Sequence, residues 1–132
     1  MRGLVASLIL MMAVGVVPAI AGRQPESVKV QVNKERVTPK SKVTIRFVEL
    51  VEDSRCPADV NCVWAGNAKI KVRFSKNGRS HDVTMDTNGP NSVTVAEGYS
   101  IKFVGLTPSP RSNIRINRNG YVAVFELTKL SR

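Results

Sequence analysis

Two cysteines provide the clearest chemistry in this chain of 132 residues. Cys56 and Cys62 are its only cysteines, and the turn-forming segment between them (57–61) allows their side chains to meet. A thiolate metal site normally needs three or four ligands, and the chain offers only one histidine and scattered carboxylates beside the cysteines. We therefore predict a Cys56–Cys62 disulfide and no metal site. Closing so short a loop stabilises the fold by about 2 to 2.5 kcal/mol.

The residues around the cysteines form a candidate binding loop. Arg55 precedes the first cysteine, Asp59 lies between the two, and Trp64, the only tryptophan, follows the second. Asp53 and Ser54 are expected to bond to the neighbouring backbone and start the loop. The preferred interpretation is structural: Trp64 packs on the disulfide beneath Arg55, and the loop plugs one end of the fold. The alternative is an exposed ligand-binding loop, because loops commonly carry binding residues.

The remaining reactive side chains do not indicate a catalytic site. His81 is the only histidine, and its neighbour Asp82 points to the opposite face if this stretch is a strand. The glycines stand singly at turns rather than in a phosphate-binding loop. Five carboxylates could converge in space, although their spacing does not indicate it: Glu49, Asp53, Asp59, Asp86 and Glu97. We predict a protein that is not an enzyme, with no catalytic residue and no cofactor.

A strong excess of positive charge predicts an anionic partner. The formal net charge is +10. Basic residues alternate with apolar ones in several strand-like runs, so we expect them to share one outward sheet face: Lys29, Arg46, Lys69, Lys71, Arg73 and Lys102. Such a face attracts acidic polysaccharides, lipid headgroups or nucleic acid. The alternative is that this face is solvated and has no partner.

The elements that position these residues read as strands. β-branched and aromatic residues alternate with polar ones, and turn signals separate the runs. The predicted strands cover residues 28–32, 43–47, 68–74, 83–85, 93–95, 101–103 and 121–127. This pattern predicts an all-β antiparallel sandwich of about seven strands, in preference to a small barrel. The last strand is apolar on both faces, so we place it centrally between two packed layers, and Ile114 and Ile116 are candidates for a short extra strand.

The amino terminus predicts export. Arg2 precedes an apolar run over residues 4–17, and the small residues Ala19 and Ala21 follow Pro18. The run is shorter than the roughly 20 residues that a membrane-spanning helix needs. We expect a signal peptide at 1–21 and one domain at 22–132, in the periplasm or outside the cell, where disulfides persist. A short membrane anchor or a buried core helix is the alternative.

The cysteine region carries a resemblance to a known group of proteins. Residues 53–66 read D-S-R-C-P, four residues, then C-x-W-A-G, and a strand-like run (68–74) follows. With the ending K-F-V-G-L-T-P (102–108) and the run 121–127, this pattern resembles a largely uncharacterised family of small exported bacterial β-sandwich proteins. The resemblance implies export and a β-sandwich, and it implies no catalytic or ligand-binding residue.

Three classes of function therefore remain open. The first is an exported, non-catalytic binding module of the cell envelope that contacts an anionic component through the basic face. The second is a structural or inhibitory module that binds another exported protein through the disulfide loop (53–66). The third is an enzyme with carboxylate chemistry. A tightly ordered loop with an exposed Trp64 favours the second class, and a contiguous basic face favours the first.

Overall fold

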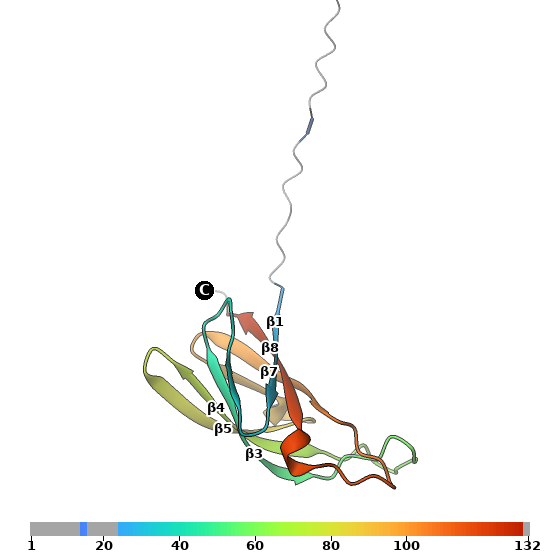
Figure 1. Ribbon diagram of the computed structural model, residues 1–132. Helices are drawn as coiled ribbons and strands as arrows, with labels where there is room; N and C mark the ends of the chain where they lie inside the picture. The colour runs from blue at the N-terminus through green and yellow to red at the C-terminus, as the bar shows by residue number, and fades with distance from the viewer. Residues whose placement is uncertain (1–13, 16–23, 131–132) are drawn as a thin grey trace, which may run out of the picture.

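The computed structural model describes residues 14–15 and 24–130 (Figure 1). The predicted signal peptide, apart from residues 14 and 15, and its cleavage site after Ala21 lie outside the described residues. None of the helices in the described part of the chain is long and apolar enough to cross a membrane.

Eight strands form two antiparallel sheets of four strands each, which confirms the predicted all-β sandwich. One sheet has the order β1-β8-β7-β6, and the other has the order β2-β3-β4-β5. The strands are β1 (Glu26–Gln31), β2 (Glu35–Val37), β3 (Thr44–Asp53), β4 (Ala68–Lys76), β5 (Arg79–Asp86), β6 (Val93–Ala96), β7 (Tyr99–Thr107) and β8 (Val122–Lys129). Two short 3-10 turns, η1 (Pro90–Ser92) and η2 (Arg118–Gly120), precede β6 and β8.

The alternation of the sequence explains how the two sheets pack. The apolar residues of β4, from Ala68 to Phe74, are fully buried, and the basic residues between them face outward. Phe74 meets Phe125 of the opposite sheet edge to face, with ring centroids 6.2 Å apart. Phe103 lies 5.6 Å from the same ring. Side chains of both sheets thus form one core between the layers.

The structure corrects three details of the predicted strands. β2 was not expected, because its three residues are all exposed and carry no alternation. The predicted short strand at Ile114 and Ile116 is wrong, since an isolated bridge between Arg111 and Ile114 is the only pairing there. β8 lies inside its sheet between β1 and β7, but its outer face is half-buried at Val122 and Val124 rather than covered by a second layer.

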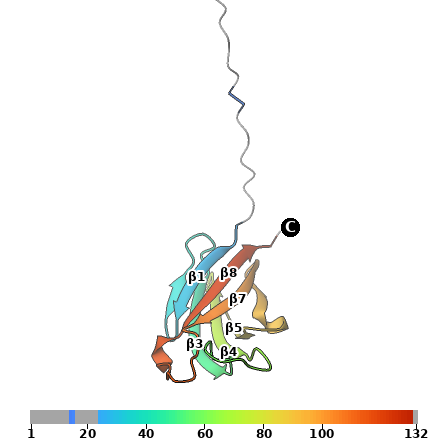
Figure 2. The same ribbon diagram turned by 90° about the vertical axis from the view of Figure 1, so that its right-hand side faces the viewer.

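Two long connections leave the sandwich at the same end (Figures 1 and 2). The disulfide loop, predicted at 53–66, is observed at 54–67 and joins β3 to β4. The second connection (108–120), here named the arginine loop, joins β7 to β8. Strand pairs Asp53–Ala68 and Thr107–Val122 border these loops. The start of β1 and the end of β8 lie at the opposite end, so we call the part formed by the two loops the loop end.

Candidate functional site

The predicted disulfide is confirmed. The Sγ atoms of Cys56 and Cys62 are bonded, and the two Cα atoms lie 5.9 Å apart. No free cysteine is present in the described residues. The bond closes the middle of the disulfide loop and leaves both loop ends attached to strands of one sheet.

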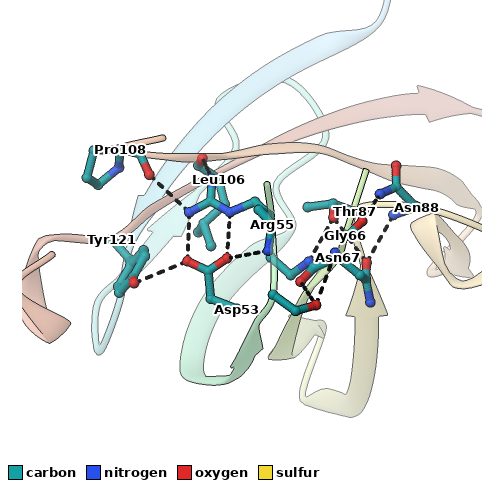
Figure 3. Close-up of polar contacts among 11 residues, drawn as sticks. Asp53, Arg55, Gly66, Asn67, Thr87, Asn88, Leu106, Pro108 and Tyr121 are labelled. Carbon is teal, nitrogen blue, oxygen red and sulfur yellow. Dashed lines mark hydrogen bonds and ion pairs between the residues drawn. The ribbon is translucent and has the colours of Figure 1, made fainter. Parts of the chain in front are cut away.

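A half-buried ion pair anchors the first residues of this loop (Figure 3). Arg55 donates two hydrogen bonds to Asp53, from Nε to Oδ1 at 2.8 Å and from Nη2 to Oδ2 at 2.9 Å. The same guanidinium donates to the carbonyl oxygens of Leu106 at 2.5 Å and Pro108 at 3.0 Å. The hydroxyl of Tyr121 donates to Asp53 Oδ2 at 3.2 Å. Arg55 therefore ties the end of β3 to the end of β7, and Asp53 adds a bond to Tyr121, the residue before β8.

The charge of Arg55 controls the ionisation of Asp53. Burial alone raises the pKa of Asp53, but the hydrogen bonds and positive charge of Arg55 outweigh it and hold the pKa below its ordinary value. Burial, followed by the negative charge of Asp53, raises the pKa of Tyr121. Asp53 is thus held as a carboxylate that accepts hydrogen bonds, and Tyr121 as a neutral hydroxyl that donates one.

The predicted stacking of Arg55 on Trp64 is wrong. The side chain of Trp64 is 78% exposed, so it does not pack on the disulfide or plug the sandwich. Arg55 instead faces Asp53 and the two carbonyl oxygens, because charge-assisted hydrogen bonds are stronger than a cation–π contact at an exposed ring. The Asp53–Arg55 pair, rather than the tryptophan, connects the loop to the end of the sandwich, and Trp64 lies at the surface.

The last residues of the disulfide loop are held as closely as the first. The hydroxyl of Ser54 donates to the carbonyl of Asn67 at 2.9 Å and accepts from its backbone N–H at 3.2 Å, which confirms that Ser54 bonds to the backbone at the loop's start. Gly66 has a positive φ of 70°, and a Cβ there would lie 2.0 Å from the Ser54 carbonyl oxygen. The side chain of Asn88 donates to the Gly66 carbonyl at 2.6 Å. Only glycine fits this closure.

Hydrogen bonds also join the disulfide loop to the arginine loop. The N–H of Ala58 donates to the carbonyl of Pro110 at 2.8 Å. Ser112 donates its N–H to Asp59 Oδ1 at 3.0 Å and its hydroxyl to Oδ2 at 2.5 Å. The hydrogen bonds from Ser112 lower the pKa of Asp59. The sequence-predicted candidate Asp59 therefore holds the two loops together.

Between these anchors, the disulfide loop presents apolar side chains to solvent. Residues 58–65 are all exposed. Val63 is 92% exposed and Trp64 is 78% exposed, the largest exposed fractions among the big apolar residues of the loops. Ile114 of the arginine loop is exposed too. A rigidly held loop that exposes neighbouring valine and tryptophan side chains is a candidate contact surface.

The arginine loop adds a feature that the sequence analysis missed. A hollow of about 540 Å³ lies between this loop and β3, lined among others by Leu50, Glu52, Arg115 and Arg118. Among the residues that the structure describes, none of the ion pairs includes an arginine of this loop. The three closely spaced arginines Arg111, Arg115 and Arg118 could have indicated this positive segment from the sequence, but the segment was predicted only to be a loop.

The predicted basic face is wrong as a single surface. Lys29 and Lys102 lie on β1 and β7, and the other four residues lie on β3 and β4 of the opposite sheet: Arg46, Lys69, Lys71 and Arg73. Carboxylates also lie beside the basic row of β4, since Glu52 pairs in register with Lys69 and Glu49 with Lys71.

An ion pair with Asp82 of β5 neutralises Arg73, one of the basic residues on the outer face of β4. Arg73 binds Asp82 through two hydrogen bonds, of 2.6 Å from Nε and 3.0 Å from Nη2. These bonds raise the pKa of Arg73 and lower that of Asp82. The sequence could not reveal this neutralisation, because strand pairing decides which charges are adjacent.

The carboxylates considered for catalysis have separate partners. Asp53 binds Arg55, Asp59 binds Ser112, and Asp86 accepts from Asn67 and Asn91. In the described part of the chain, no three His, Cys, Asp or Glu side chains are grouped to hold a metal ion.

His81 also has a partner that the sequence did not indicate. Its Nε2 lies 3.0 Å from Oε1 of Glu97, in the turn between β6 and β7, whereas its neighbour Asp82 binds Arg73. His81 and Asp82 therefore act separately, as the alternation of a strand requires.

Compared with models of protein families, with curated proteins and with solved structures, the chain matches none.

Proposed function

We propose that this protein is an exported, non-catalytic binding module of the bacterial cell envelope, and that it binds through the loop end. The proposal depends on one observation: the disulfide loop is held by hydrogen bonds at both ends while its apolar side chains are exposed to solvent. Val63 and Trp64 face solvent, while the bonds of Asp53, Arg55 and Gly66 hold the loop at its base. A surface fixed before it binds loses less conformational entropy on binding.

Export is supported by two independent features of the chain. The amino-terminal pattern of Arg2, an apolar run and small residues is typical of a signal peptide. The Cys56–Cys62 disulfide is the kind of bond that persists outside the reducing cytosol. Mass spectrometry of the exported protein is expected to give a chain that begins at residue 22, and an intact Met1 on exported material would contradict this part of the proposal.

An anionic envelope component is the partner class that the charge favours. The two loops (54–67 and 108–120) contain four arginines against one aspartate, a formal charge of +3, which Glu52 and Asp53 at their border reduce to +1. The positive side chains thus accompany the exposed apolar ones rather than forming a separate sheet face. Attraction of this kind weakens as salt screens it.

The second candidate is a structural or inhibitory module that binds another exported protein through the same loop. Its support is the exposure of Trp64 on an anchored loop, the feature that favours this class, because a preorganised tryptophan that enters a pocket of a partner is a common hot spot of protein interfaces. The two candidates share a surface and differ in the chemistry of the partner.

Capture from separated envelope fractions distinguishes these candidates. The immobilised mature protein is exposed to lipid, polysaccharide and exported-protein fractions at low and high salt, beside Trp64→Ala and the control Val95→Ala. Val95 is 64% exposed on β6, away from the loop end, so its loss removes exposed apolar surface elsewhere.

Each outcome of this capture has a definite meaning. Binding of an anionic fraction that is lost at high salt and weakened only by Trp64→Ala supports the first candidate. Binding of one protein that survives salt and fails only in Trp64→Ala supports the second. Binding that Trp64→Ala leaves unchanged contradicts the assignment of the loop end as the binding surface.

A further inference from the structure

We infer that the loop end docks on the surface of an anionic phospholipid bilayer, with Trp64 and Val63 inserted among the headgroups and the arginines of the arginine loop on lipid phosphates. This inference rests on the proposed function and names its partner. Three observations carry it: the exposed apolar side chains of the loop end, the arginines of the arginine loop that form no ion pair among the described residues, and the position of the start of β1 and the end of β8 at the opposite end.

The apolar tips come from two loops that hydrogen bonds hold together. Val63 and Trp64 are exposed on the disulfide loop, and Ile114 of the arginine loop is exposed at the rim of the hollow. The Ala58–Pro110 and Asp59–Ser112 bonds join the two loops, so both sets of exposed side chains belong to one connected end of the sandwich. Tryptophan favours the boundary between water and hydrocarbon, because its ring is apolar and its N–H is polar.

The positive charges of the same end are available to a phosphate. Both aspartates of the two loops and their border are engaged: Asp53 with Arg55 and Tyr121, and Asp59 with Ser112. In the described chain, Arg115 and Arg118 line the hollow beside Glu52 without an ion pair to it. A guanidinium presents several N–H donors to phosphate oxygens.

The shape of the loop end suits a fluid surface. Residues 58–65 are exposed without interruption, so the valine and tryptophan stand out from the loop instead of lining a recess. A bilayer accepts protruding side chains without a complementary cavity, whereas a protein partner must provide one. The start of β1 and the end of β8 lie at the far end of the sandwich, so they leave this approach open (Figure 1).

Few apolar side chains are involved, and so charge must contribute to the binding. We expect weak binding to neutral vesicles and clear binding to anionic ones, as for proteins that combine a small apolar insertion with basic residues. Each arginine near an anionic surface is expected to strengthen binding about fivefold. Loss of two arginines should then weaken it about thirtyfold.

The single tryptophan makes a direct experiment possible. Because Trp64 is the only tryptophan of the chain, all tryptophan emission reports on the loop end. The exported protein, with its start at residue 22 verified by mass, is titrated with vesicles of phosphatidylcholine alone and of phosphatidylcholine with phosphatidylglycerol. We expect a blue shift and quenching by lipids brominated on their acyl chains with the anionic vesicles, and reversal of both at high salt.

Matched variants separate insertion from general attraction. Val63→Asp puts a charge beside the reporter and is expected to abolish the blue shift, whereas Val95→Asp, the same change on β6, should retain it. Arg115→Gln with Arg118→Gln is expected to lower vesicle affinity about thirtyfold. Lys29→Gln with Lys102→Gln removes the same charge from the β1-β8-β7-β6 sheet and should lower it much less.

The outcomes distinguish this inference from the proposed function beneath it. An unchanged Trp64 emission with anionic vesicles at low salt overturns bilayer docking, and so does an equal response of Val63→Asp and the exported protein. If vesicles fail while an exported protein is still captured in a Trp64-dependent manner, the loop end remains a binding surface and its partner is a protein. If neither binding depends on Trp64, the inference and the proposed function both fail.

Discussion

At the scale of single residues, Arg55 and Trp64, which were predicted to stack on each other, have separate roles. Arg55 lies at the base of the disulfide loop and makes hydrogen bonds to Asp53, Leu106 and Pro108. Trp64 lies at the surface and has no such role. The reason is donor chemistry: the guanidinium has several N–H groups to satisfy when it is half-buried, and an aromatic ring satisfies none of them as well as oxygen does.

Replacement of Trp64 tests this division. Because its side chain is 78% exposed, Trp64→Ala is expected to change the free energy of unfolding by no more than about 0.5 kcal/mol. Urea denaturation followed by circular dichroism measures it. A loss of several kcal/mol would restore the interpretation of Trp64 as a plug.

Replacement of Asp53 tests the ion pair at the loop base. In Asp53→Asn the side chain of Arg55, only 14% exposed, keeps its charge without the carboxylate, so we expect a loss of about 2 kcal/mol in the free energy of unfolding. Asp82→Asn is the matched control, since it breaks an arginine pair that is exposed on the sheet surface, and little change is expected there. Equal losses in the two variants would contradict a special role for the buried pair.

The lowered pKa of Asp53 predicts a pH dependence of stability. The folded state binds fewer protons than the unfolded state in this range, so this part of the stability is present above the ordinary carboxyl pKa and is lost as pH falls through the lowered one. The difference in unfolding free energy between the original protein and Asp53→Asn should therefore shrink on acidification. Urea titrations at several pH values measure it, and a difference independent of pH would refute the prediction.

At the scale of elements, the disulfide loop is closed chiefly by contacts near its ends. Ser54 and Asn67 bond across the entrance, and Gly66 approaches the Ser54 carbonyl too closely for any side chain. Two register shifts in the pairing of β3 with β4 keep Glu49 and Glu52 opposite lysines while Leu50 remains opposite Ile70.

Gly66→Ala is expected to be strongly destabilising. Its left-handed backbone costs a residue with a side chain about 1 to 2 kcal/mol, and the clash with the Ser54 carbonyl adds to this. Gly78→Ala is the control, because Gly78 has a similar φ of 78° and open space around the position of a Cβ. Thermal denaturation compares the two. If both variants lose the same stability, the close approach at Gly66 has no energetic importance.

At the scale of the whole molecule, one core couples the two sheets and leaves their ends free for other roles. Phe125 of β8 contacts Phe103 of its own sheet and Phe74 of the other. On the edge away from β1 and β2, His81 of β5 and Glu97 of the β6–β7 turn join the sheets by a further polar contact. The sandwich is therefore held together by one shared core, and the exposed Val63 and Trp64 lie outside it at the loop end.

Truncation of Phe125 tests this coupling. Phe125→Ala removes a fully buried ring shared by both sheets and is expected to cost about 3 to 5 kcal/mol, with a single unfolding transition. Phe125→Leu is a milder variant for the case that the alanine variant does not fold, with an expected loss of about 1.5 kcal/mol or less. Val104→Ala, on the exposed face of β7, should change little. Separate transitions for the two sheets would contradict a shared core.

The sequence by itself determined the class of fold, most of its strands and the disulfide. These follow from local rules: alternation of side chains marks a half-buried strand, and two cysteines a few residues apart can meet without help from the rest of the chain. It also identified the segment 53–66 as the most distinctive local feature of the chain.

Only the tertiary structure decided which side chains of that segment face solvent and which charges are compensated. Arg55 could not be assigned from sequence because two of its partners, Leu106 and Pro108, lie about fifty positions away. The basic residues divide between two sheets because strand order is set by long-range pairing, and periodicity contains no information about which strands are neighbours. The loop end exists for the same reason: hydrogen bonds between residues 58–59 and 110–112 join loops that are distant in the chain.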